Sequence, residues 1–173
     1  MLNSKAVRLP RLIVLIAALA MLLSVFLPQA TATGERAEWI NEYPDTVVDA
    51  ELGFTAAELR HVSALEFARI LSEQSAFYTV IFILLLVLCA ATVLFALLGR
   101  AIPVLVFDVL SLGMFYLHVA DYRLRGYVPS ERYRWGIGHY LFVVMAAVAF
   151  GCAVWLLVKK VQLKKGAKVP QSE

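Results

Sequence analysis

The sequence predicts an all-α integral membrane protein: a four-helix transmembrane bundle with a short extracellular amphipathic helix between the first and second spans. Hydrophobic residues make up 61% of the chain, above the roughly 45–50% that is usual for soluble domains. The chain contains four long apolar runs, and a helix needs about 20 apolar residues to cross ~30 Å of hydrocarbon. Lys and Arg gather at both chain ends, as they do in cytoplasmic segments of membrane proteins.

The first apolar run predicts a transmembrane helix over residues 12–32, after a basic cytoplasmic segment of residues 1–11. A second interpretation stays open for this run. Its basic start and the A-x-A spacing of Ala30 and Ala32 are also typical of a cleaved signal peptide. Both interpretations put the segment that begins at residue 33 on the same side of the membrane.

The other three apolar runs predict spans over residues 77–98, 101–120 and 139–158. The middle one contains Asp108, about 12 Å from the cytoplasmic end at the 1.5 Å rise of a helix. A carboxylate inside hydrocarbon is costly and indicates function by default. The alternative is a polar helix-packing contact, with Ser111 one turn away.

Basic residues predict the orientation of the bundle. Residues 1–11 carry three Lys and Arg, and the tail of residues 159–173 carries five Lys. Both termini are therefore predicted to be cytoplasmic, and the chain is expected to be a multi-pass protein of the cell membrane. Residues 33–76 and 121–138 then lie outside. The terminal lysines fit anionic lipid and do not indicate nucleic acid.

The first outer segment is acidic, with nine Asp and Glu against three Arg. It predicts an amphipathic helix over residues 55–73. Thr55 and Glu58 fit the capping box that begins a helix, and Phe54 and Leu59 fit the hydrophobic staple around it. Apolar and charged residues then recur with a helical period, so this helix is expected to lie along the membrane surface.

Two histidines are the candidate catalytic residues. His61 follows Glu58 by three positions, and His118 precedes Asp121 by three and Tyr122 by four. Helical residues at these spacings are neighbours, and a carboxylate beside an imidazole orients it for acid–base chemistry. The candidate site is therefore His61 and His118, supported by Glu58, Asp121 and Tyr122. An ordinary solvated histidine and an interfacial anchor are the alternatives for His61 and His118.

The remaining polar residues predict simpler roles. Arg123 and Arg125 of the basic second outer segment are candidate contacts for lipid headgroups or for the acidic first segment. His139 begins the last span and fits an interfacial residue. Cys89 and Cys152 both lie inside predicted spans, so no disulfide framework is expected. No metal site and no cofactor are predicted.

The layout and two short motifs carry a resemblance. With "FTAAELRH" in the outer segment and "FYLHVADY" at the outer end of the third span, the chain resembles the lipoprotein intramolecular transacylase family of Gram-positive bacteria. The resemblance implies transfer of an acyl chain from the diacylglyceryl group of a lipoprotein to the α-amine of its N-terminal cysteine, leaving the lyso-form. It implies His61 as the base and His118 as its partner, with no cofactor. The chain departs from the family pattern at Ala64 and Leu65, where an acidic residue and a valine are usual.

Two other functions stay open. The chain also fits a non-enzymatic four-span accessory protein whose acidic outer helix docks on a membrane protein partner; this predicts co-purification with that partner and dispensable histidines. It fits, third, a small oligomeric transporter with a proton or ion path through Asp108, which predicts loss of function on Asp108→Asn.

Overall fold

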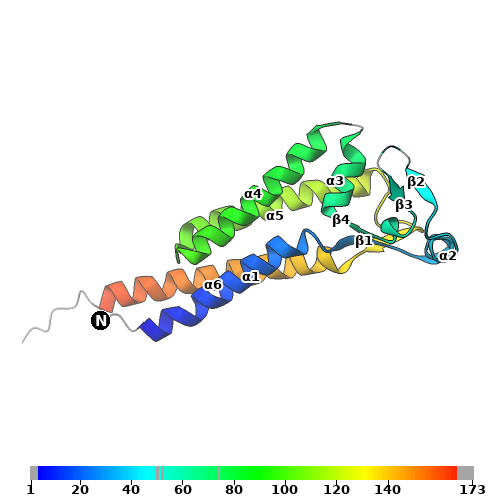
Figure 1. Cartoon of the computed structure of the whole chain (residues 1–173). Coiled ribbons are helices and arrows are strands. Elements are labelled where there is room, and N and C mark those ends of the chain that lie inside the picture. The colour runs from blue at the N-terminus through cyan, green and yellow to red at the C-terminus, as the bar shows by residue number, and fades with distance from the viewer. Residues whose placement is uncertain (1–3, 50, 52, 74, 167–173) are drawn as a thin grey trace, which may run out of the picture.

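Four long helices run side by side and carry a small folded cap at one end (Figure 1). The computed structural model describes residues 4–49, 51, 53–73 and 75–166. Each long helix contains a stretch that is long and apolar enough to cross a membrane. The predicted four-span all-α bundle is confirmed. The long helices are α1 (Ser4–Ser24), α4 (Phe77–Leu97), α5 (Ala101–Leu124) and α6 (Ile137–Gly166).

The cap contains short helices and strands that the sequence did not predict. Three antiparallel strands pair in the order β4-β1-β5, so β1 is central, and β2 and β3 form a separate pair. The cap elements are β1 (Pro28–Ala32), α2 (Gly34–Glu42), β2 (Val47–Asp49), β3 (Phe54–Thr55), the 3-10 turn η1 (Glu58–Arg60), β4 (His61–Ser63), α3 (Ala64–Ser72) and β5 (Tyr133–Trp135). We call these elements and the loops between them the cap.

The predicted outer helix over residues 55–73 is wrong in its first half. The α-helix begins only at Ala64, as α3, because residues 61–63 pair with β1 as strand β4. Only one bond of the predicted capping box forms, in which the Glu58 carboxylate accepts from the Thr55 backbone N–H at 2.8 Å; the Thr55 hydroxyl donates to the same carboxylate at 3.1 Å. These bonds close only a short turn, and they lower the pKa of the Glu58 carboxyl.

The first helix ends earlier than predicted, and the last two spans are longer. Helix α1 stops at Ser24, because residues 28–32 form the central strand of the cap sheet. Its packing along α6 makes α1 a member of the bundle, and Ala30 of the A-x-A motif is fully buried. Helix α5 continues to Leu124, and α6 continues to Gly166, into the predicted tail; residues 167–173 of that tail lie outside the described residues.

The bundle has a packed interior and an apolar outer surface. Its core includes Met21, Leu85, Phe115 and Phe142, and the last two rings stack at 4.0 Å between centroids. Only 28% to 33% of each apolar span is buried inside the protein. The rest of these apolar surfaces faces outward, which suits helices surrounded by lipid.

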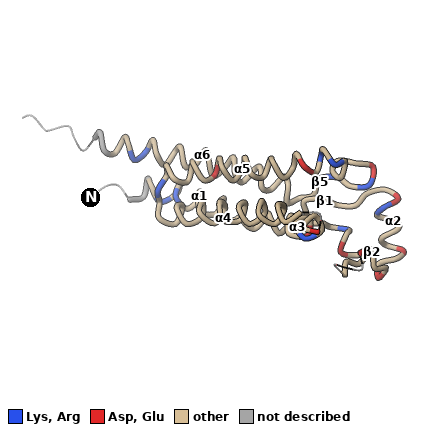
Figure 2. The backbone as a smooth tube through the Cα atoms, turned by 90° about the horizontal axis from the view of Figure 1, so that it is seen from above, with Lys and Arg blue, Asp and Glu red and all other residues tan. Residues whose placement is uncertain are grey.

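Charged residues gather at the two ends of the bundle (Figure 2). At the end away from the cap, Arg11 donates to the Leu97 carbonyl, and Lys160 donates to the Gly99 carbonyl at 2.5 Å. Cations stabilise a helix C-terminus because its last carbonyls carry partial negative charge. Gly99 reverses the chain there with φ +66°, a conformation that favours glycine. The two cations thus fasten α1 and α6 to the α4–α5 turn.

Ser63 begins α3 with a complete capping box, and its loss is expected to cost about 1 kcal/mol. The Glu66 backbone N–H donates to the Ser63 hydroxyl at 3.3 Å, and the Ser63 N–H donates to the Glu66 carboxylate at 2.6 Å. Ser63→Ala should lower the thermal midpoint in detergent by about 2–4 °C. Ser72→Ala is the control, since that hydroxyl donates to a carbonyl of its own helix. Equal midpoints for the two variants would contradict the assignment.

Candidate functional site

One face of α5 carries the polar residues that point into the protein. Residues at spacings of three and four share a helix face, and the buried residues of α5 follow such spacings. Its buried polar side chains are Asp108, Ser111, His118 and Tyr122, with Phe115 between them. His118 and Tyr122 lie next to the cap, and only 2% and 1% of their surfaces are exposed.

His118 and Tyr122 are neighbouring buried rings, and each carries a polar atom without a hydrogen-bond partner among the described residues. Their ring centroids lie 4.9 Å apart with the ring planes at 56°. Among the described residues, neither the His118 Nε2 nor the Tyr122 hydroxyl has a hydrogen-bond partner. A buried polar group without a partner costs about 1–3 kcal/mol, and such atoms in a folded protein call for an explanation such as a catalytic role.

The cap closes over this pair. The Phe67 ring of α3 stacks on Tyr122 at 4.2 Å between centroids, and the Ala64 backbone lies against the His118 imidazole. The Ala64 N–H also donates to the Val25 carbonyl at 3.3 Å, which ties α3 to the end of α1. Helix α3 therefore covers the His118 and Tyr122 side chains at the junction of bundle and cap.

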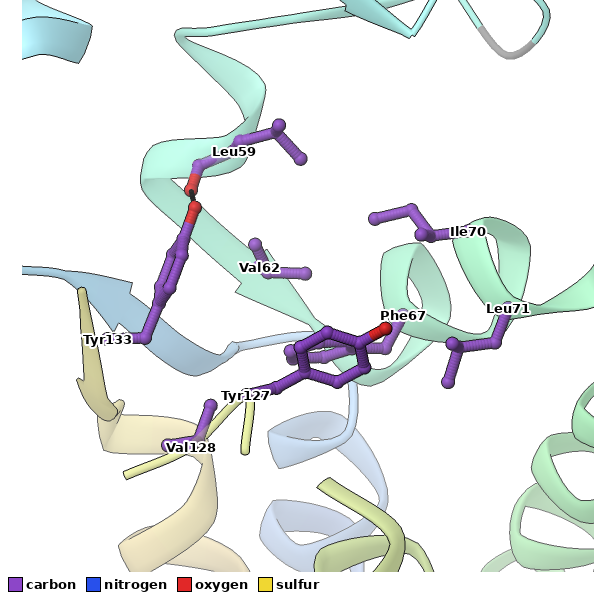
Figure 3. Close-up of a pocket in the computed structure, with 8 residues that line it drawn as sticks. All are labelled: Leu59, Val62, Phe67, Ile70, Leu71, Tyr127, Val128 and Tyr133. Carbon is purple, nitrogen blue, oxygen red and sulfur yellow. Dashed lines mark hydrogen bonds between the residues drawn. The ribbon is translucent and has the colours of Figure 1, made fainter. Parts of the chain in front are cut away.

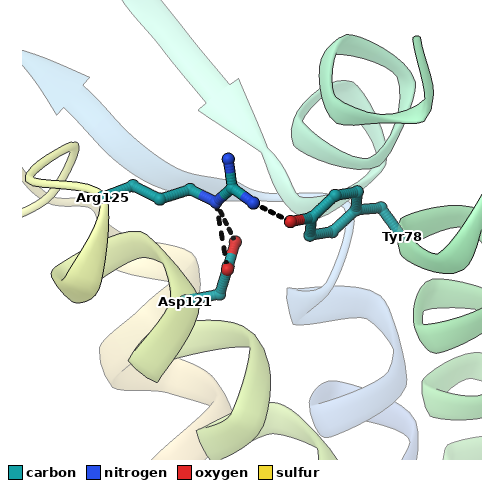
Figure 4. A network of polar contacts seen from close by, with 3 residues as sticks. All are labelled: Tyr78, Asp121 and Arg125. Atoms are coloured by element: carbon teal, nitrogen blue, oxygen red, sulfur yellow. Dashed lines mark hydrogen bonds and ion pairs between the residues drawn. The ribbon is translucent and has the colours of Figure 1, made fainter. Parts of the chain in front are cut away.

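Asp121 is paired with Arg125 rather than with an imidazole (Figure 4). The Arg125 Nε lies 3.0 and 3.1 Å from the two Asp121 carboxylate oxygens, and another guanidinium nitrogen donates to the Tyr78 hydroxyl. The Asp121 carboxylate raises the pKa of the Arg125 guanidinium. Asp121 is near enough to interact electrostatically with His118, so its predicted support of that ring is indirect. Arg125, a predicted headgroup contact, joins α5 to α4.

His61 lies in β4, an edge strand of the cap sheet, and is exposed. The next residue, Val62, packs in the cluster that contains Tyr122. Neighbouring side chains of a strand point to opposite faces, so His61 points away from that cluster. Among the described residues, no hydrogen bond or ring contact joins His61 to His118. The predicted helical pairing of Glu58 with His61 does not form, since no α-helix covers these positions.

His139 is a site neighbour that the sequence indicated only as an interfacial residue. Its ring stacks on Trp135 at 4.3 Å and lies 5.5 Å from Phe115, and its Nδ1 is buried without a hydrogen-bond partner among the described residues. Arg123, a predicted headgroup contact, lies over the same indole, 5.7 Å from the ring centroid. Trp135 lies in β5 and His139 in α6, so no helical spacing indicated this contact.

Asp108 lies deep in the bundle, as predicted, with 2% of its surface exposed. Its Oδ1 has no hydrogen-bond partner among the described residues. The Ser111 hydroxyl donates instead to the Phe107 carbonyl at 2.8 Å. Cys89 of α4, fully buried, is near enough to interact with both side chains. Asp108 is thus part of a small polar contact between α4 and α5, some 15 Å along the helix from His118.

Comparisons with protein-family models, with curated proteins and with solved structures find no match to this chain. Within the described ranges, no three His, Cys, Asp or Glu side chains come together as metal ligands. The candidate site is therefore defined by the geometry around His118 and Tyr122.

Proposed function

We propose that the protein is a membrane acyltransferase that moves an acyl chain within a bacterial lipoprotein N-terminus, from the diacylglyceryl group to the α-amine. One observation carries this proposal: the buried His118 and Tyr122 rings are neighbours at the junction of bundle and cap, and the His118 Nε2 and the Tyr122 hydroxyl have no hydrogen-bond partner among the described residues. An acid–base group and a hydrogen-bond donor in a water-poor site are what acyl transfer needs. The resemblance in "FTAAELRH" and "FYLH" supports the substrate class.

In the proposed reaction, His118 takes a proton from the α-amine while the nitrogen attacks the ester carbonyl. The Tyr122 hydroxyl donates a hydrogen bond to the carbonyl oxygen as negative charge develops on it. The bond between the carbonyl carbon and the glyceryl oxygen then breaks. The leaving oxygen takes the proton from the imidazolium. The products are an amide and a free glyceryl hydroxyl, and His118 is neutral again.

The exposed His61 has a different part in this proposal. An α-amine has a pKa of about 7.7–8.0 and is mostly protonated at neutral pH, yet only the free amine attacks. Residue 61 comes three positions before Ala64, or about 10 Å along an extended strand, and Ala64 touches His118. The two histidines can thus act at two places on one headgroup-sized substrate without touching. His61 accepts the first proton of the ammonium on the solvent side.

His61→Ala is expected to lose about tenfold in rate at pH 7 and to recover above pH 8, where the amine is already free. The assay uses purified protein in detergent and a synthetic diacylglyceryl-cysteine peptide. Because the product is an isomer of the substrate, tandem mass spectrometry must locate the acyl group on nitrogen. His61→Gln is the matched variant with the same expectation. Equal loss at pH 7 and pH 9 would remove His61 from this role.

A second candidate is the accessory protein, favoured by the exposed surface of the cap. Tyr43, Val47 and Val48 are exposed apolar side chains, and they come after the acidic helix α2, which carries Glu35, Glu38 and Glu42. Such a surface fits a protein partner. This function requires that cells keep the phenotype of the wild-type protein when both histidines are replaced, and that a membrane protein co-purifies.

A further inference from the structure

Two cavities of opposite character share a wall in the cap. Tyr127 and Tyr133 line both of them. The Tyr133 hydroxyl donates to the Leu59 carbonyl at 3.0 Å, and the Ser130 hydroxyl accepts from the Tyr133 N–H at 3.1 Å. These bonds hold the loop between α5 and β5 against η1, so the shared wall is a built part of the cap.

The first cavity is apolar, with a volume of about 160 Å³. Figure 3 shows the aliphatic and aromatic side chains that line it, Tyr127 and Tyr133 among them. Besides the two tyrosines, it is lined by Leu59, Val62, Phe67, Ile70, Leu71 and Val128. A dry apolar cavity of roughly 150 Å³ takes a benzene-sized molecule. This one therefore has room for a short apolar group of about six carbons.

The second cavity is an open basic hollow of about 620 Å³. Arg36, Arg125 and Arg132 line it, against the single carboxylate of Glu131. Arg125 is partly neutralised by Asp121. Arg36 and Arg132 also line an adjoining hollow, which adds the carboxylate of Glu35. Guanidinium groups bind phosphate through paired hydrogen bonds, so the hollow suits a phosphate.

We propose that these two cavities form one binding site for an anionic phospholipid. The phosphate binds among Arg36, Arg125 and Arg132, and the beginning of an acyl chain enters the apolar cavity past Tyr127 and Tyr133. The site begins at Arg125, directly after the end of α5 at Leu124, which is the depth of lipid headgroups if α5 spans the membrane. None of these residues is His118 or Tyr122, so the site stands or fails independently of the proposed acyl transfer.

The headgroup is tested with soluble short-chain lipids and calorimetry on the full chain in non-ionic detergent. Dihexanoyl phosphatidylglycerol is expected to bind about tenfold more tightly than dihexanoyl phosphatidylcholine. Arg36→Gln and Arg132→Gln should each weaken the anionic lipid about fivefold, the effect of about 1 kcal/mol per basic residue. Arg134→Gln is the control, since Arg134 is exposed on β5 and does not line the hollow.

Binding of the acyl chain is tested by filling the apolar cavity with a larger side chain. Ile70→Trp should weaken dihexanoyl phosphatidylglycerol at least tenfold and leave glycerol phosphate, a headgroup without a chain, unaffected. Leu65→Trp on the same helix is the control, because Leu65 is exposed and lies outside the cavity. Running the titrations also in His118→Phe protein separates lipid binding from acyl transfer.

Three results would overturn the site. The first is equal affinity for the two dihexanoyl lipids. The second is an equal loss in Arg134→Gln and in the two lining arginine variants, which would indicate general surface charge. The third is glycerol phosphate binding as tightly as dihexanoyl phosphatidylglycerol, which would indicate an anion site that does not use the apolar cavity.

Discussion

His118→Phe is expected to abolish acyl transfer and to leave the protein folded, with an unchanged or higher thermal midpoint. General acid–base groups contribute about 10²–10⁴ to a rate, and phenylalanine cannot carry a proton. The same change removes a buried nitrogen that has no hydrogen-bond partner among the described residues. A buried polar atom without a partner costs about 1–3 kcal/mol, so its removal offsets the lost contact between the imidazole and the Ala64 backbone. The rate of acyl transfer should therefore fall while the thermal midpoint stays the same or rises.

Tyr122→Phe is the companion variant. It deletes only the hydroxyl, which has no hydrogen-bond partner among the described residues, and keeps the stack on Phe67, so the fold should be preserved. The loss of one donor to the developing oxyanion is expected to cost about 10²–10³ in rate. Both variants are assayed with the diacylglyceryl-cysteine peptide, alongside thermal unfolding in the same detergent. Wild-type turnover by His118→Phe would end the acyltransferase proposal.

Gly136→Ala is expected to be the most destabilising single-methyl substitution in the cap. A Cβ at this position would lie 2.8 Å from the Pro28 carbonyl carbon and closer still to its oxygen. The Gly136 N–H donates to the Gln29 carbonyl at 2.8 Å, so the obstacle is backbone that is already fixed by strand pairing. Overpacking costs about 1–3 kcal/mol and occasionally more, which corresponds to a fall of roughly 2–12 °C in the thermal midpoint.

Gly151→Ala is the matched control for this prediction. Gly151 lies within α6, and a Cβ there would meet nothing within 4 Å. Alanine is the better helix former by about 1 kcal/mol, so the midpoint should stay or rise slightly. The comparison is made by thermal unfolding of purified protein, followed by tryptophan fluorescence. A Gly136→Ala midpoint equal to that of Gly151→Ala would mean that β1 can move away from the start of α6.

The candidate site could be predicted only in part. His118 and Tyr122 were found because a histidine and a tyrosine at a spacing of four share a helix face, and α5 does continue far enough to hold them. His61 was placed on a helix because the Thr55 to Glu58 capping signal is local. Strand pairing of residues 61–63 with β1 is a contact with a segment about thirty residues away, and no local pattern reports it.

The cap was beyond the reach of the sequence for the same reason. Its strands are two to five residues long. Segments this short show no clear alternation of apolar and polar residues. The basic hollow brings Arg36 together with Arg125 and Arg132. These two arginines come about ninety positions or more after Arg36 in the sequence. The first outer segment, for which only one helix was predicted, folds over the end of the bundle.

By itself, the sequence determined the four spans, because length and apolarity over some twenty residues are local properties that hydrocarbon imposes on a helix. It also determined the inward face of α5, since residues at spacings of three and four must share a side. The start of α3, the burial of His118 and the adjoining of the two cavities became visible only in the folded protein. They depend on contacts between segments far apart in the sequence, such as the pairing of β4 with β1.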